Sequence, residues 1–346
     1  MKKQSRIDFI DILRFVFIIF ILYIHFMFII TGGDEFRFRG SYIFVEAFLF
    51  ITGYFTASHF NKSKIRKLDK KAEASISYTF KKFSAFIPYI IVAILLGLFF
   101  HLKHMQGSFV SYFIEVAKIP VDLLFGSAII YTGFSGPLWY SSALFLAFPL
   151  FCLIMQNKNY KNIRNLVFLI SIPLFICFTN LDTLGVGAII RVFFDLLIGA
   201  TIFDFARHVS KVKFNARGRI FLQVFETLSF VAIIYVISHS SDIIRELAHV
   251  KVLVYALLII FFTLIFSRKT FTSQIKAPFI RKASIVVLPA FLIHEPIACI
   301  MMDLRLNLPS YLIFMIYVAI TFTISALLVF IVSRLKKLEL KKWFLE

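Results

Sequence analysis

The stretch FIDILRFVFIIFILYIHFMFII, residues 9–30, decides the class of fold. Wound as an α-helix, a run of this length spans about 33 Å, which is enough to cross the hydrocarbon core of a bilayer. The run is longer than the core of a signal peptide and has no small-residue cleavage site, so we expect it to stay in the protein. It therefore predicts a transmembrane helix.

Similar apolar runs recur along the 346 residues, of which 60% are hydrophobic and 46 are Phe. Water-soluble domains are only about half apolar, so lipid is the expected solvent here. Runs of roughly 17–25 mostly apolar residues predict an all-α integral membrane protein with about ten transmembrane helices. We place these helices at residues 9–30, 41–60, 83–102, 137–155, 164–180, 184–206, 220–238, 250–267, 283–302 and 310–332.

Lys and Arg are distributed very unevenly between the connections. The connections that alternate from the N-terminal tail hold 29 of these residues, whereas the opposite set holds 7. Positive loops stay in the cytoplasm, so the asymmetry predicts that both termini are cytoplasmic. It also accounts for the net charge of +19 without a nucleic-acid partner, because the apolar runs leave no soluble domain to carry a basic face.

The pattern favours one transmembrane domain over residues 1–346, with a short basic cytoplasmic tail at 333–346. The longest outer connection, residues 103–136, contains several glycines among aromatic and aliphatic residues and is expected to fold back onto the membrane. The three cysteines lie inside apolar runs without metal-ligand spacing. We therefore expect neither a disulfide nor a metal site.

The first predicted helix carries ionisable residues at two depths. Asp11 and Arg14 lie in its N-terminal third, and His25 lies toward its other end. A charge inside the hydrocarbon costs ~2.5–3.5 kcal/mol on insertion scales, so each retained charge is a candidate for function. Arg14 and His25 lie within ~20° of each other around the helix and about 16 Å apart along it.

Each of these residues also has a structural interpretation. Asp11 and Arg14 can form an i,i+3 ion pair at the membrane boundary, and His25 can be a satisfied interior histidine. For His25 we favour function, because an imidazole is the side chain best suited to move protons at ordinary pH.

Glu46, near the start of the second predicted helix, is expected at the depth of His25, where a carboxylate can orient the imidazole. Gly53 follows seven residues later on nearly the same face, in the sequence Ile51-Thr52-Gly53-Tyr54. A missing side chain there permits close approach by another backbone or by a ligand. By itself the glycine indicates only tight helix packing.

Other polar residues inside predicted helices are weaker signals. Arg191 and Asp195 are spaced i,i+4 in the sixth helix and are able to neutralise each other. His294 lies midway through the ninth helix, beside a proline that interrupts the backbone hydrogen bonds. Trp139, at the outer end of the fourth helix, fits an interfacial anchor as well as a residue that stacks on a substrate.

The order and spacing of these residues resemble the membrane acyltransferase family 3. In that family an Arg or Lys, ten residues and a His mark helix 1, which is the spacing of Arg14 and His25. An acidic residue followed by a Ser-Gly-Phe type element marks helix 2, and here Glu46 precedes Thr52-Gly53-Tyr54. The resemblance continues in residues 137–141 (PLWYS), 191–199 and 284–294, and so covers essentially the whole chain.

One feature of that family is poorly kept. Two arginines, three residues apart, usually precede the proline that opens helix 3, whereas this chain has Lys82 and Ala85 ahead of Pro88. Lys81 and Lys82 are still able to meet phosphates.

The resemblance implies transfer of an acyl group, most often acetyl from cytoplasmic acetyl-CoA, to a hydroxyl of a cell-surface polysaccharide or its lipid-linked precursor at a bacterial plasma membrane. His25 is then the general base, Glu46 holds its tautomer, and Arg14 contacts the donor and the developing oxyanion. Donor phosphates are assigned to Arg14, Lys81 and Lys82. Substrate contacts are assigned to Asp11, Thr52, Gly53, Tyr54, Trp139, Arg191 and His294.

Two other classes of function stay open. In a proton-coupled transporter or flippase of a glycan precursor, the same buried charges form a proton relay and Arg14 binds an anionic substrate. A structural partner in a glycan-assembly complex has little reason to retain Arg14, His25 and Glu46 in lipid. An acyltransferase consumes acetyl-CoA and leaves an ester, whereas a flippase moves its substrate unchanged.

Overall fold

The computed structural model describes residues 7–32, 38–61, 68–105, 109–157, 159–166, 169, 185–239 and 248–343. In these ranges all regular secondary structure is helical. The long helices are α1 (Asp8–Ile30), α2 (Ile43–Phe60), α3 (Leu68–Phe83), α4 (Ile87–His104), α7 (Leu138–Met155), α9 (Val186–Lys211), α10 (Ala216–His239), α12 (Ala248–Ser267), α14 (Val287–Asp303) and α15 (Ser310–Trp343). The short elements are η1 (Arg39–Tyr42), α5 (Phe109–Ala117), α6 (Ile119–Leu123), η2 (Thr272–Gln274), α13 (Pro278–Ala283) and η3 (Ser284–Val286).

Nine helical stretches within the described ranges are long and apolar enough to cross a membrane. They coincide with nine of the ten predicted helices, and the remaining one, predicted at 164–180, lies mostly outside the described residues. The chain is therefore a multi-pass membrane protein, and its described part is built from helices. Helix α15 continues past its predicted end at residue 332 as far as Trp343, so most of the predicted tail is helical.

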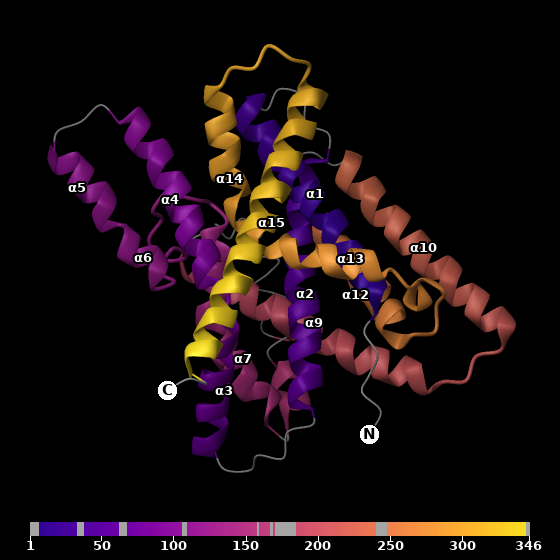
Figure 1. Cartoon of the computed structure of the whole chain (residues 1–346). Coiled ribbons are helices and arrows are strands. Elements are labelled where there is room, and N and C mark those ends of the chain that lie inside the picture. Colours follow the sequence, from indigo (N-terminus) through magenta and orange to yellow (C-terminus); the bar gives the residue numbers. More distant parts are fainter. Residues whose placement is uncertain are drawn as a thin grey trace.

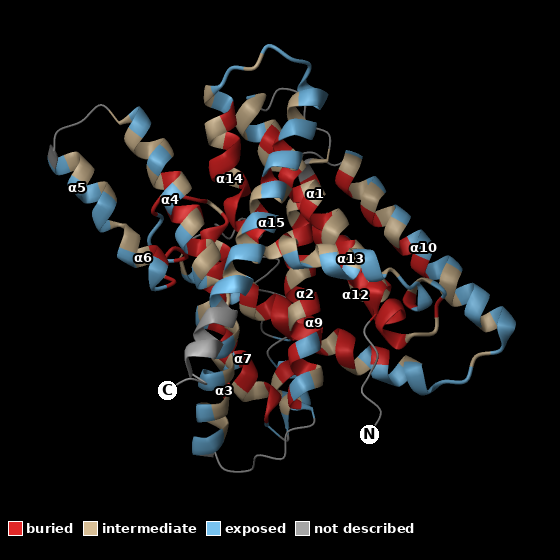
Figure 2. Cartoon of the chain, viewed as in Figure 1, coloured by how far each residue is buried: buried red, intermediate tan, exposed pale blue. Residues whose placement is uncertain are grey.

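Helix α2 packs on α9, and α9 also packs on α12, whereas α1 packs on α14 (Figure 1). Figure 2 shows that buried residues concentrate on these helices, whereas much of α10 and α15 is exposed. The exposed side chains are largely apolar, as with Phe225 and Leu228 of α10 and Met315 and Phe330 of α15. An apolar outer surface of this kind is what contact with the hydrocarbon of a bilayer requires.

Two glycines bring α2 and α9 into close contact. A Cβ atom on Gly53 would lie 2.2 Å from the carbonyl oxygen of Leu196, and one on Gly199 would lie 2.3 Å from the carbonyl oxygen of Phe50. These distances leave no room for a side chain, so the two backbones approach where the glycines lie. We expected Gly53 to permit close approach either by another backbone or by a ligand, and the structure places another backbone there.

We expect Gly53→Ala to destabilise the fold, because the added methyl group pushes α9 away from α2. Overpacking typically costs ~1–3 kcal/mol, and here the obstructing atom belongs to backbone that has no rotamer to change. The thermal unfolding midpoint of the purified protein in detergent measures the effect, with Ser58→Ala on the same helix as the control. A Gly53→Ala protein that is as stable as the wild type but inactive would instead identify a ligand contact.

The basic segment 61–82, predicted as a loop, contains helix α3. Its buried residues Ser75, Thr79 and Phe83 recur every four positions and therefore share one helical face. That face packs against α7, where Nε2 of Gln156 donates a hydrogen bond to Oγ of Ser75 at 2.7 Å. The high lysine content concealed this amphipathic pattern in the sequence.

The connection 103–136 folds back into the helical bundle after α5 and α6. Gly97 of α4 makes room for it, because a Cβ atom there would lie 1.9 Å from the carbonyl oxygen of the buried Phe134. Within the connection, the buried carboxylate of Asp122 accepts a hydrogen bond from Oγ1 of Thr132 at 2.8 Å. The returning segment is thus part of the packed interior.

This returning segment braces α14 at its proline. Pro296 has no N–H group, so it leaves the carbonyl oxygen of Leu292, four residues earlier, without its helical donor. Oγ of Ser135 donates a hydrogen bond to that oxygen at 2.9 Å. The break in the helix is therefore compensated by a residue of the fold-back connection.

The start of α1 is fastened to the segment that leads into α14. The buried carboxylate of Asp8 accepts a hydrogen bond from Nη2 of Arg281 at 2.6 Å. One turn later, Asp11 accepts a hydrogen bond from Oγ of Ser284 at 3.2 Å. These contacts set the position of α1 relative to α14, the two helices that carry the histidines described below.

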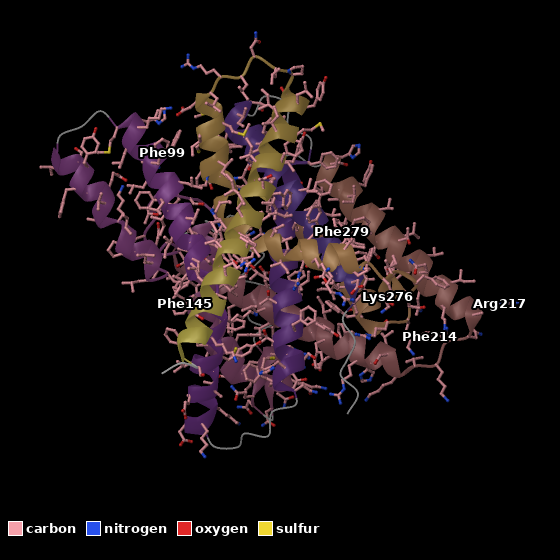
Figure 3. The ribbon with its side chains drawn as sticks, viewed as in Figure 1. Phe99, Phe145, Phe214, Arg217, Lys276 and Phe279 are labelled. Carbon is pink, nitrogen blue, oxygen red and sulfur yellow. The ribbon has the colours of Figure 1, made fainter. Side chains whose placement is uncertain are left out.

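The basic connection between α12 and α14 packs against the first turns of α10. The backbone N–H of Phe271 donates a hydrogen bond to Oε1 of Gln223 at 2.8 Å. Figure 3 shows Lys276 and Arg217, one from each region, on the same flank of the molecule. The charge pattern predicts that this connection and the one that precedes α10 lie on the same side of the membrane.

Candidate active site

His25 of α1 and His294 of α14 lie side by side. Their ring centroids are 4.6 Å apart and the ring planes are inclined by 77°, an edge-to-face arrangement. His25 is partly exposed, whereas His294 is fully buried. The sequence suggests separate roles for these residues, but the fold joins them into one pair.

The imidazole of His294 is held in one orientation. Its Nδ1 lies 2.7 Å from the carbonyl oxygen of Phe291, so Nδ1 carries the hydrogen and donates. Its own carbonyl oxygen accepts a hydrogen bond from the hydroxyl of Tyr317 at 3.1 Å. Nε2 is buried and has no hydrogen-bond partner among the described residues. His294 therefore presents a lone pair at Nε2 inside the bundle.

Glu46 contacts Arg191 instead of His25. The carboxylate is fully buried and forms an ion pair with the guanidinium. The helix packing explains why Glu46 meets Arg191. Glu46 lies seven residues before Gly53 on the same face of α2, and Arg191 lies five residues before Leu196 on α9. Because Gly53 touches Leu196 and the two helices run parallel, the two charges come together. This corrects the expectation that Glu46 holds the tautomer of His25.

The same ion pair changes the interpretation of Asp195. Arg191 is paired with Glu46 and also acts electrostatically on Asp195, four residues later on the same helix. Oδ1 of Asp195 accepts a hydrogen bond from the hydroxyl of Tyr255 at 3.1 Å. Lys251, which lies at the edge of the predicted helix 250–267, is buried at the start of α12 and acts electrostatically on Asp195. The charged groups of α2, α9 and α12 thus form one buried network.

Trp139 and Tyr140 connect this network to the histidine pair. The guanidinium carbon of Arg191 lies 5.9 Å from the centre of the Trp139 ring, and Trp139 is partly exposed. The ring of Tyr140 meets Phe291, the residue that accepts the hydrogen bond from His294, edge-on at 5.1 Å. The start of α7 therefore lies between the two groups of polar residues, a role for Tyr140 that the sequence did not suggest.

Arg14 and Lys82 form a second, cationic part of the site. Nη1 of Arg14 lies 3.6 Å from Oδ1 of Asp11, the i,i+3 pair considered from the sequence. The Nζ atom of Lys82 lies 4.7 Å from the centre of the Phe148 ring, and Arg14 acts on it electrostatically. Burial lowers the pKa of Lys82 to about 8. Lys81, by contrast, is exposed.

The remaining predicted contacts on α2 belong to helix packing. Tyr54 is buried and stacks on Phe266, with ring centroids 3.6 Å apart. The carbonyl oxygen of Thr52 accepts a hydrogen bond from Oγ1 of Thr56 at 2.8 Å, which is a contact within the helix. Tyr54, like Gly53, therefore takes part in the packing of α2 against its neighbours, and the contact of Thr52 lies within its own helix.

The chemistry available to these groups is proton transfer and the binding of anions. An imidazole pair can remove a proton from a hydroxyl, and two nearby cations can hold phosphate groups or a developing negative charge.

Residues 7–330 match acyltransferase family 3, described as an acyltransferase domain. The match covers most of the chain, so the protein belongs to this family and is a membrane acyltransferase. None of the curated proteins and none of the solved structures with which the chain was compared matches it.

Proposed function

We propose that the protein is an O-acetyltransferase that moves acetyl from cytoplasmic acetyl-CoA to a hydroxyl of a cell-surface polysaccharide or its lipid-linked precursor, with His25 as general base. In this proposal it acts in a bacterial plasma membrane with both termini in the cytoplasm. The observation that carries the proposal is the pairing of His25 with His294 inside a family acyltransferase domain.

The reaction needs one proton to move. The hydroxyl oxygen of the acceptor attacks the thioester carbonyl carbon while His25 removes the hydroxyl proton. The C–S bond then breaks, and the thiolate of CoA takes that proton from His25. The partial exposure of His25 supports this assignment, because a base must be reachable by the group it deprotonates.

Arg14 and Lys82 are the proposed contacts of the donor. CoA carries several phosphate charges, and cations that lie near each other attract a polyanion more strongly than either does alone. The Nζ atom of Lys82 lies over the ring of Phe148, close enough to Arg14 for the two charges to interact, whereas Lys81 is exposed. Of the two lysines assigned from the sequence, Lys82 is therefore the better candidate.

Replacing Lys82 by Met should raise KM for acetyl-CoA by roughly 10–100-fold, the effect of losing one charge-assisted contact. Lys81→Met, its immediate neighbour, should raise KM by a few-fold at most, because that side chain is exposed. The measurement is thiol release from acetyl-CoA in membranes with matched protein levels. Equal effects of the two substitutions would remove Lys82 from the donor site.

The affinity for acetyl-CoA should also depend on pH. Lys82 is charged below its pKa of about 8 and loses its charge as pH rises through that value, so KM should rise on the alkaline side. Lys82→Arg, which stays charged throughout, should abolish this rise. A wild-type KM that stays constant across pH 8 would contradict the assignment.

Trp139 and Arg191 are the proposed contacts of the acceptor. Trp139 is partly exposed beneath the guanidinium, and an aromatic ring beside polar groups offers a sugar both a face to stack on and hydrogen-bond partners.

The experiment that tests the function compares cells that express the protein with cells that carry the empty vector. We expect base-labile acetate on the surface glycan of the expressing cells only. Glycan that reaches the surface in larger amounts without added acetate would identify a flippase instead. Acetate at equal levels in both strains would overturn the proposal.

A further inference from the structure

The buried Nε2 of His294 needs an explanation. Polar atoms inside a protein usually have a hydrogen-bond partner, and an orphan in a packed site often marks a function. Here the Nδ1 hydrogen is fixed on the carbonyl oxygen of Phe291, so the unpartnered Nε2 is an acceptor that cannot be satisfied by turning the ring. The neighbouring ring that can supply a donor is that of His25.

We infer that His294 is the positioning residue of His25: in the complex with the acceptor, the His25 imidazole turns about its side-chain bonds until one N–H donates to Nε2 of His294, which has no partner among the described residues, and its other nitrogen then faces the acceptor hydroxyl. This inference rests on the proposed acetyl transfer. A neutral imidazole then orients His25, which is the role that we expected of the carboxylate of Glu46. That carboxylate is paired with Arg191.

The placement of His294 suits this task. A positioning residue must itself be fixed in place. Nδ1 of His294 is hydrogen-bonded to the carbonyl oxygen of Phe291, its own carbonyl oxygen accepts a hydrogen bond from the Tyr317 hydroxyl, and the residue is fully buried. The brace of Ser135 on α14 holds the backbone one turn away. His294 contacts the base and not the reacting atoms, and its protonation is the same before and after the reaction.

A neutral partner has a chemical consequence for the second half of the reaction. A carboxylate partner would stabilise the imidazolium form of His25 strongly, as in Ser-His-Asp triads. An imidazole acceptor orients His25 with less stabilisation of the charge, so the proton taken from the hydroxyl is released readily to the thiolate of CoA. The two steps balance, because one proton leaves the oxygen and the same proton arrives on sulfur.

The test uses two substitutions of His294 in the full-length protein in membranes. His294→Phe keeps the ring and removes the acceptor, whereas His294→Gln keeps an acceptor oxygen near the position of Nε2. We expect His294→Phe to lower kcat by roughly 10²–10³-fold with KM for acetyl-CoA unchanged, within the range that proton-transfer groups contribute. We expect His294→Gln to recover at least tenfold of that loss, as an estimate for one restored hydrogen bond.

His239→Phe is the matched control. His239 lies at the end of α10, is exposed and stacks on Tyr235, away from the site, so its replacement should leave kcat unchanged. Thermal unfolding of each variant shows whether the fold is kept.

The outcomes separate the two proposals. If the wild type releases thiol and forms ester but His294→Phe keeps its kcat, or if Gln and Phe lower activity equally, the inference about His294 is overturned and the acetyltransferase stands. If the wild type neither releases thiol from acetyl-CoA nor forms an ester, the proposed function fails and the role given to His294 fails with it.

Discussion

Replacing His25 by Ala should lower the rate of acetyl transfer by about 10²–10⁴-fold, the contribution expected of a general base. The loss follows because the acceptor hydroxyl then has no group to take its proton, while the donor contacts at Arg14 and Lys82 remain. KM for acetyl-CoA should therefore change little. The initial rate of ester formation in membranes, at equal protein levels, is the measurement.

The control for this prediction is His239→Ala, which removes an exposed histidine of the same protein outside the site. We expect that variant to keep the wild-type rate. A His25→Ala variant with wild-type kcat would show that the base is another group, and a rise in KM alone would make His25 a binding residue.

Replacing Arg191 by Met should destabilise the protein by about 3–5 kcal/mol, the usual cost of removing one partner of a buried ion pair. The reason is that the carboxylate of Glu46, which is fully buried, is left without its cation. The thermal unfolding midpoint in detergent should fall clearly. Combining Arg191→Met with Glu46→Gln should restore part of the loss, because the orphaned charge is then also removed.

The matched comparison is the pair of Lys103 and Asp303 at the end of α4. Its Nζ and Oδ2 atoms are 2.8 Å apart, but the lysine side chain is 53% exposed, so Lys103→Met should cost no more than about 1 kcal/mol. Equal effects of Arg191→Met and Lys103→Met would contradict the view that Glu46 depends on Arg191.

The helical membrane fold was predictable from the sequence, because each segment that crosses the lipid must by itself be apolar and long enough to span the bilayer. A run such as residues 9–30 must be apolar over its whole length wherever it packs. Two segments differ from the prediction. Residues 61–82 were expected to form a loop because they are rich in lysine, but their apolar and small residues form one face of helix α3. Helix α15 continues past residue 332 to Trp343 because no glycine or proline interrupts it there.

The site was predictable only in part, because its geometry depends on which helices meet. Spacing along one helix identified Arg14 and His25 and suggested a pair of Arg191 with Asp195. Spacing could not show that α14 places His294 beside His25. Nor could it show that the close contact of α2 with α9 at their glycines pairs Arg191 with Glu46. Lys251 was missed because it lies at the edge of an apolar run, where the sequence does not show whether a lysine is buried or exposed.

The most direct test of the central claim supplies radiolabelled acetyl-CoA to the cytoplasmic face of inverted membrane vesicles that contain the acceptor glycan. Thiol release and base-labile label on the glycan are followed together, for the wild type and for His25→Ala. We predict that the wild type forms one ester for each thiol released and that His25→Ala forms almost none. Thiol release without ester, or equal ester with both proteins, would contradict an acetyl transfer that depends on His25.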